Sequence, residues 1–301
     1  MKAALVIFAF VVPAQAAVLE VGSGTAFSLP SAAIAAAKPG DTVHIAAGSY
    51  RDCAAWTVDD LTIEGENGTV LREAICQGAG IFVVNAPNAI IRNISFEGAS
   101  IAEGNGSGIR ANGQRLLVEH CSFRNNQDGI LTANNGGAEL IVRDSRFEKN
   151  GACLPNKGCA HGIYAGVITR LRVETSHFRD AVAGHYIKSR ARRTEVIGNR
   201  IEDGDSGRSS YLIDLPNGGA LEMTGNTLQK GPRTENPTAA VILGEEGDKR
   251  PAGPVTISDN IFRNDGPPTI FVRNDAKSPA LLSGNKITGK VRLLVGRGAV
   301  D

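Results

Sequence analysis

One hydrophobic motif recurs along this chain at intervals of 23 to 34 residues. It begins with an apolar residue and ends five positions later with Phe, Ile or Leu, and the residues between are mostly polar or small. A repeat of this length cannot bury its own apolar face, so neighbouring copies must stack on one another. The sequence therefore predicts a solenoid with one long surface. Its eight copies end at Phe96, Phe123, Phe147, Phe178, Ile201, Leu228, Phe262 and Ile287.

A second set of short apolar runs follows the motif in successive repeats. Each run is too short for a helix, is rich in β-branched residues and is bounded by Gly, Asn, Asp or Ser. Two or three such strands in a repeat of about 25 residues describe an all-β parallel β-helix, whose equivalent strands stack about 4.8 Å apart. The runs cover residues 108–111, 129–132, 162–165, 186–189, 212–215, 241–244 and 271–274.

Asn occupies the same motif position in the last repeats, at Asn199, Asn226, Asn260 and Asn285. Stacked side-chain amides at one turn can satisfy backbone groups that the turn would otherwise bury unpaired. We expect a structural role for this Asn column. The open ends of a solenoid need caps, and the Ala-rich segment 29–37 is expected to form a short helix over the first coil.

The first residues predict export. Residues 1–16 combine a short basic start, an apolar stretch and a small-residue cleavage site near Ala16, which is the pattern of a secretory signal peptide. The mature domain then covers residues 17–301, and we expect it to be periplasmic or secreted. A formal net charge of +1 gives no strong attraction to nucleic acid or to a membrane surface.

The five cysteines of an exported chain are interpreted first as disulfides. Cys153 and Cys159 are expected to close a loop, and Cys53 and Cys76 to link neighbouring coils. Cys121 stands at the motif position that Ser or Asn occupies elsewhere, which indicates a buried free thiol.

Two segments carry a resemblance to a known family. Residues 32–41 with 47–50, and the repeated Gly-Ile runs, resemble the pectate-lyase-like right-handed parallel β-helix superfamily over nearly the whole mature chain. The resemblance implies a single right-handed β-helix with a groove on one strand face. That superfamily includes polysaccharide lyases, uronate epimerases, glycoside hydrolases and non-enzymatic proteins, so the fold does not choose the reaction.

Strand alternation predicts which side chains leave the core. If Ile109, Ile130, Ile163, Ile187, Ile213 and Ile242 stack inside, the residue after each of them points outward. The expected outward column is Arg110, Leu131, Tyr164, Lys188, Asp214, Leu243 and Arg273. The opposite register would bury Lys188 in the core without a partner, which is costly.

The central coils bring several acid–base residues together in the sequence pattern. His161, His185 and Tyr211 stand two residues before the inward Ile, and Arg190 stands two after Lys188. We predict a catalytic set of His161, Tyr164, His185, Lys188, Arg190, Tyr211 and Asp214, with Asp128, Arg192 and Glu245 as substrate-binding residues. The simpler alternatives are that the two His cap the core and that Lys188 and Asp214 form an ordinary surface salt bridge.

These residue types suit an enzyme that acts on a uronic-acid polymer. We expect this enzyme to be a monomer whose partner is an acidic polysaccharide substrate. A cation (Arg190, Lys188 or Arg192) would neutralise the sugar carboxylate, a base (His161, His185 or Lys188) would remove the adjacent proton, and Tyr164 or Tyr211 would protonate the leaving oxygen. We expect a polysaccharide lyase or uronate epimerase without a cofactor. Because no acidic column suits Ca²⁺, calcium is the weaker alternative. A glycoside hydrolase and a non-catalytic polysaccharide-binding protein are the competing functions.

Overall fold

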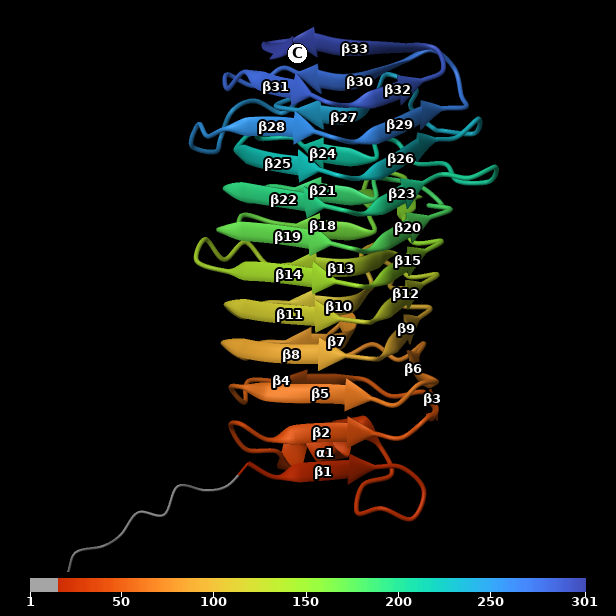
Figure 1. The fold of residues 1–301 in the computed structure, drawn as a ribbon. Coiled ribbons are helices and arrows are strands. Elements are labelled where there is room, and N and C mark those ends of the chain that lie inside the picture. Colours follow the sequence, from red (N-terminus) through yellow and green to blue (C-terminus); the bar gives the residue numbers. More distant parts are fainter. Residues whose placement is uncertain (1–15) are drawn as a thin grey trace, which may run out of the picture.

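The computed structural model describes residues 16–301, which form an all-β right-handed parallel β-helix (Figure 1). The predicted signal peptide lies almost entirely outside the described residues. Three parallel sheets run the length of the molecule; sheet A faces the viewer in Figure 1, sheet B forms the right side and sheet C lies behind.

The strands of each sheet follow one another in chain order, one per coil. Sheet A contains β1 (Val18–Val21), β2 (Thr42–Ile45), β5 (Leu61–Gly65), β8 (Asn88–Arg92), β11 (Arg115–Glu119), β14 (Glu139–Arg143), β19 (Arg170–Glu174), β22 (Arg193–Ile197), β25 (Ala220–Thr224), β28 (Val255–Ser258), β31 (Ala280–Ser283) and β34 (Gly298–Val300). Sheet B contains β3 (Gly48–Tyr50), β6 (Thr69–Arg72), β9 (Ser95–Glu97), β12 (Ser122–Arg124), β15 (Arg146–Glu148), β20 (His177–Arg179), β23 (Arg200–Glu202), β26 (Thr227–Lys230), β29 (Ile261–Asn264) and β32 (Lys286–Thr288). Sheet C contains β4 (Ala54–Trp56), β7 (Gly80–Val84), β10 (Ser107–Ala111), β13 (Asp128–Thr132), β18 (Ile163–Ala165), β21 (Ile187–Ser189), β24 (Ile213–Leu215), β27 (Ala239–Leu243), β30 (Thr269–Asn274) and β33 (Val291–Gly296).

The repeated motif spans the corner between sheets A and B. Val118 lies in β11 and Phe123 in β12, and both are fully buried in the core. The Phe residues that end the motif stack from coil to coil, with ring centroids 4.6 Å apart between Phe123 and Phe147 and 4.5 Å apart between Phe147 and Phe178. The motif therefore fixes both the corner and the register of the stack.

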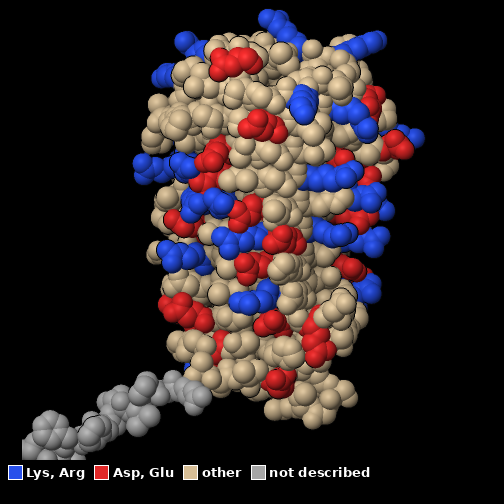
Figure 2. Space-filling model, viewed as in Figure 1, with Lys and Arg blue, Asp and Glu red and all other residues tan. Residues whose placement is uncertain are grey.

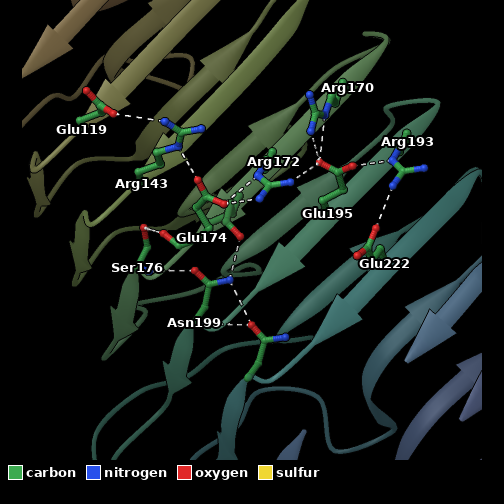
Figure 3. Close-up of polar contacts among 12 residues, drawn as sticks. Glu119, Arg143, Arg170, Arg172, Glu174, Ser176, Arg193, Glu195, Asn199 and Glu222 are labelled. Carbon is green, nitrogen blue, oxygen red and sulfur yellow. Dashed lines mark hydrogen bonds and ion pairs between the residues drawn. The ribbon is translucent and has the colours of Figure 1, made fainter. Parts of the chain in front are cut away.

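The predicted Asn column forms a hydrogen-bonded ladder at this corner. The backbone N–H of Asn199 donates to Oδ1 of Asn226 at 2.8 Å, and the N–H of Asn226 donates to Oδ1 of Asn260 at 2.9 Å. The N–H of Ser176 joins the ladder through Oδ1 of Asn199 (Figure 3). Cys121 stands in the same column as a buried free thiol, as predicted.

Both predicted disulfides form, Cys53–Cys76 and Cys153–Cys159. Disulfides persist in oxidising compartments, so they are compatible with the predicted export. The helix α1 (Pro30–Ala36) caps the first coil and buries Ala33 and Ile34 against the core. Within the described part of the chain, no helix is long and apolar enough to cross a membrane.

The outer face of sheet A carries interleaved charges (Figure 2). Glu195, only 3% exposed, accepts from Arg170 at 2.6 Å and from Arg193 at 2.5 Å, and Arg193 also reaches Glu222 at 2.8 Å (Figure 3). Because carboxylate and guanidinium groups pair across neighbouring coils, this face is largely neutralised by its own residues.

Candidate active site on sheet C

The candidate site lies on the outer face of sheet C. There the regular alternation of inward and outward side chains is interrupted in two coils. Tyr186 and Ile187 are consecutive and both pack in the core, as do Leu212 and Ile213 in the next coil. Two consecutive inward residues place the preceding residue outside. His185 and Tyr211 therefore lie on the outer face, and the alternative in which His185 caps the core is wrong.

The outward column is correct from Arg110 to Asp214 and wrong in the coil after it. Ile213 pairs with Val241, so Val241 and not Ile242 continues the inward stack. Ile242 pairs with Asp214 and packs outside the core against Tyr211, while Leu243 is buried in the core. Sequence alone could not separate these registers, because 239–243 is a continuous run of small and apolar residues.

The rings of His161, His185 and Tyr211 stack along the helix axis. The imidazole centroids of His161 and His185 are 4.7 Å apart, and the rings of His185 and Tyr211 are 5.2 Å apart. Each imidazole accepts a hydrogen bond from a backbone N–H group of the next coil. The N–H of His185 donates to Nδ1 of His161 at 3.0 Å, and the N–H of Tyr211 donates to Nδ1 of His185 at 3.1 Å.

These backbone contacts fix the state of both imidazoles. Since Nδ1 must accept a hydrogen bond, the proton of each neutral ring resides on Nε2. Burial lowers the pKa of His161 well below its usual value, and burial followed by the charge of Lys188 lowers the pKa of His185 to about 3. Both rings are thus neutral Nε2–H donors, and neither has a free lone pair with which to act as a base.

A phenol and a guanidinium meet beside this stack. Nε of Arg190 donates to the hydroxyl oxygen of Tyr164 at 2.9 Å. The terminal nitrogens of Arg190 hold the carboxylate of Glu246 through two hydrogen bonds, at 2.7 and 2.9 Å, and one of them also donates to Asn217. Bidentate pairing of this kind is how guanidinium groups select carboxylates.

Lys188 lies between two carboxyl groups. Its Nζ is 3.3 Å from Oδ2 of Asp214 and 3.5 Å from Oε1 of Glu246. Asp214 is fully buried, and among the described residues neither of its oxygens has a hydrogen-bond partner. Burial therefore raises the pKa of Asp214 to about 7, although Lys188 opposes the shift. Nε2 of His185 approaches the same carboxyl group at 3.4 Å.

Long connections border this part of sheet C. The segment before β18 forms a hairpin of β16 (Ala152–Leu154) and β17 (Gly158–Ala160), closed by the disulfide Cys153–Cys159. The connections 203–212 and 231–238 run from sheet B to sheet C, and 244–254 runs from sheet C to sheet A. The last of these carries Glu246 over the outer face of sheet C to Arg190 and Lys188.

The three predicted binding residues have different places. Asp128 is buried at the end of the His column, where its Oδ1 accepts the N–H of His161 at 2.6 Å, so it supports that column from within. Glu245 lies beside the Tyr211 hydroxyl; burial and then Glu245 raise the pKa of Tyr211 to about 12. Arg192 is exposed in the turn before β22, and no hydrogen bond or ion pair among the described residues joins it to the site.

Two contributors were absent from the predicted set, Asn217 and Glu246. Both lie in connections after sheet C strands, where sequence spacing gives no direction for a side chain. Within residues 16–301, no group of three or more His, Cys, Asp or Glu side chains is arranged to hold a metal ion.

Comparison with known proteins supports the fold. Residues 42–161 match the family described as "Right handed beta helix region". No curated protein matches the sequence. Open reading frame 18 of Geobacillus virus E2 is 13% identical with a TM-score of 0.57, and the alignment covers 86% of this chain and 58% of the viral protein.

Two enzymes of known structure are also similar. An alginate lyase from Paenibacillus sp. is 13% identical with a TM-score of 0.48, covering 94% of this chain and 99% of the lyase. A pectin methylesterase from Aspergillus niger is 12% identical with a TM-score of 0.48, covering 95% and 92%. At 13% identity, the similarity to the viral protein shows the fold alone.

Proposed function

We propose that this protein is an exported polysaccharide-acting enzyme that cleaves a uronic-acid polymer by β-elimination, with uronate epimerisation as the alternative outcome of the same first step. The observation that carries the proposal is the carboxylate of Glu246 held by Arg190 beside Tyr164 and Lys188. A sugar carboxylate in the place of Glu246 would meet the guanidinium of Arg190, the amino group of Lys188 and the phenol of Tyr164 at once.

The three groups divide the reaction among them. Arg190 neutralises the substrate carboxylate, which makes the proton on the adjacent carbon acidic. Lys188 removes that proton as the base, and Tyr164 gives its proton to the departing sugar oxygen as the carbon–oxygen bond breaks. The bond between these two ring carbons becomes double, and the departing sugar leaves with a neutral hydroxyl group.

Asp214 prepares Lys188 for this role. An amine acts as a base only after it has given up a proton, and Asp214 lies 3.3 Å away with a pKa of about 7. Transfer of one proton from Lys188 to Asp214 leaves a neutral amine facing the substrate and a neutral acid in the interior.

His161 and His185 do not serve as bases in this scheme. Their Nε2–H groups are donors and not bases, and their rings stack with that of Tyr211 as a buried support beneath Lys188 and Asp214. Arg190 supplies the positive charge at the substrate carboxylate. We therefore expect activity to survive removal of calcium by a chelator.

A glycoside hydrolase is the second candidate, supported by one contact. The Lys188 ammonium lies within 3.5 Å of both Asp214 and Glu246, so these two carboxyl groups are at most about 7 Å apart. Carboxyl pairs at about 5 to 9.5 Å serve hydrolases. The complete burial of Asp214 argues against direct contact with a sugar.

One assay separates these functions. The purified mature protein is incubated with alginate, pectate, hyaluronan and glucuronan while ultraviolet absorbance of the new conjugated double bond is followed. We expect absorbance to rise on one substrate and to be lost in Tyr164→Phe and Lys188→Met, but not in the matched control Lys286→Met, an exposed residue of sheet B.

New reducing ends without absorbance would establish hydrolysis instead. Altered uronate stereochemistry without cleavage would establish epimerisation. If the folded protein leaves all four polymers chemically unchanged, the proposal is wrong for these uronate polymers, and binding of the same polymers without turnover would favour the non-catalytic function.

A further inference from the structure

A buried lysine lies next to the site and has no part in the chemistry described above. Lys230 ends strand β26 and is fully buried. Its Nζ donates to the backbone carbonyl of Ser210 at 2.5 Å. An ammonium group in a protein interior is costly to retain, so its position calls for a reason.

The partner of Lys230 connects it to the imidazole stack. The carbonyl of Ser210 and the N–H of Tyr211 belong to one planar peptide group and point in opposite directions. The carbonyl faces Lys230, while the N–H donates to Nδ1 of His185 at 3.1 Å. A cation on the carbonyl polarises the peptide and strengthens its N–H as a donor.

We propose that Lys230 is a positioning residue whose ammonium group, through the Ser210–Tyr211 peptide, holds His185 in its Nε2–H form. The Nε2–H group then faces Asp214 at 3.4 Å. His185 in turn orders the imidazole of His161, since the backbone N–H of His185 donates to Nδ1 of His161 at 3.0 Å. The expected effect of Lys230 on turnover rests on the proposed function, whereas its expected effect on the His185 tautomer does not.

A purely structural role is the alternative. Asn264, the partner of Lys230 in the next coil of sheet B, also binds backbone carbonyls at this corner, those of Pro267 and Lys290. A neutral amide therefore suffices for a corner cap. Lys230 differs because it brings a charge, and because its acceptor belongs to the peptide that binds His185.

The role of the Lys230 charge can be tested by changing the pH. Burial lowers the pKa of Lys230 to about 8, although Asp203 opposes the shift. Raising the pH through about 8 should therefore weaken the hold on His185 in the unmodified protein. The titratable and charged groups that face His185 are His161, Lys188, Tyr211, Asp214, Lys230 and Glu246.

The test is nitrogen-15 NMR of the imidazoles, of which the chain has only five. In the unmodified protein we expect His185 as the Nε2–H form at neutral pH, with a change in its Nδ1 shift centred near the Lys230 pKa of about 8. In Lys230→Gln, which keeps a donor and removes the charge, both tautomers should be populated. Lys230→Arg should restore the original signals.

Kinetics provide the second measurement. Lys230→Gln should lower kcat by about tenfold, as expected when the imidazole that faces Asp214 is misplaced, while KM changes by less than about twofold. Unchanged His185 signals and kcat in folded Lys230→Gln would overturn the inference. If that variant does not fold, a flat Nδ1 shift across the alkaline titration of the unmodified protein overturns it. Absence of turnover in the unmodified protein would count against the proposed function alone.

Discussion

Glu246 binds Arg190 through both carboxylate oxygens, at 2.7 and 2.9 Å, and so occupies the place proposed for the substrate carboxylate. The Glu246 side chain is 37% exposed and comes from a connection, whereas the Arg190 side chain is 18% exposed and directly follows β21. The Arg190 hydrogen bonds lower the pKa of Glu246, which keeps it ionised as a competitor for the guanidinium.

Glu246→Gln should therefore improve substrate binding. The amide keeps the shape of the side chain but gives up the charge, so KM should fall by roughly tenfold, corresponding to one charge-assisted hydrogen bond. Initial rates over a range of polymer concentrations measure this, with Glu235→Gln in the neighbouring 231–238 connection as the matched control. Complete loss of activity in Glu246→Gln would instead assign Glu246 a direct chemical role, as the hydrolase alternative requires.

Asp214 should make stability depend on pH. Its pKa is raised from 3.8 to about 7, so the folded state holds a proton that the unfolded state has released. This contribution to stability is complete below about pH 4 and is lost as the pH rises through about 7. Asp214→Asn should be more stable than the unmodified protein at alkaline pH, by on the order of 3 kcal/mol, and should show little gain in acid.

Urea unfolding of both proteins on the two sides of this range measures the difference. Asp259→Asn, at an exposed turn, is the matched control and should show no comparable pH dependence. Equal midpoints for Asp214→Asn and the unmodified protein at alkaline pH would mean that Lys188 fully compensates the buried carboxylate.

The stacked imidazoles should remain neutral in weak acid. Burial holds the pKa of His185 at about 3, against 6.5 for the free side chain. The neutral imidazole therefore contributes to the stability of the folded protein above about pH 6.5, and this contribution is lost as the pH falls toward 3. His44, which Glu20 contacts at 2.7 Å, has a raised pKa and should protonate first. An NMR titration that protonated His185 near its ordinary pKa would contradict the geometry of the stack.

The extent to which the sequence predicted this molecule has a physical explanation. The inward Phe and Ile residues and the Asn column recur once per coil. The pattern therefore predicts the fold, the position of the corners and which coils hold the site. Alternation placed Tyr164, Lys188 and Asp214 correctly because each directly follows an inward Ile. It could not settle His185, because the two residues after it, Tyr186 and Ile187, both point inward, nor Glu246, whose direction depends on a connection without periodicity.

The Asn ladder should contribute to stability and not to catalysis. The side-chain amide of Asn226 donates to the carbonyl of Val196 at 2.8 Å and to Oδ1 of Asn260 at 2.9 Å, all in the interior. Asn226→Ala leaves several buried backbone groups unpaired and should cost about 3 kcal/mol. Asn285→Ala, at the half-buried end of the same ladder, should cost clearly less. Denaturant unfolding and kcat measured together would reveal any unexpected link between the ladder and turnover.

The two disulfides should differ in what they stabilise. Cys53–Cys76 spans 23 residues of sequence and Cys153–Cys159 spans six, and a longer closed loop removes more entropy from the unfolded chain. Replacing the first pair by Ser should therefore cost about 1 kcal/mol more than replacing the second. The second pair closes the hairpin directly before His161, so its loss should lower activity more than global stability. Thermal unfolding and initial rates of both double variants measure the contrast, and a larger loss of stability for the Cys153–Cys159 pair would show that its hairpin packs more firmly than loop length alone implies.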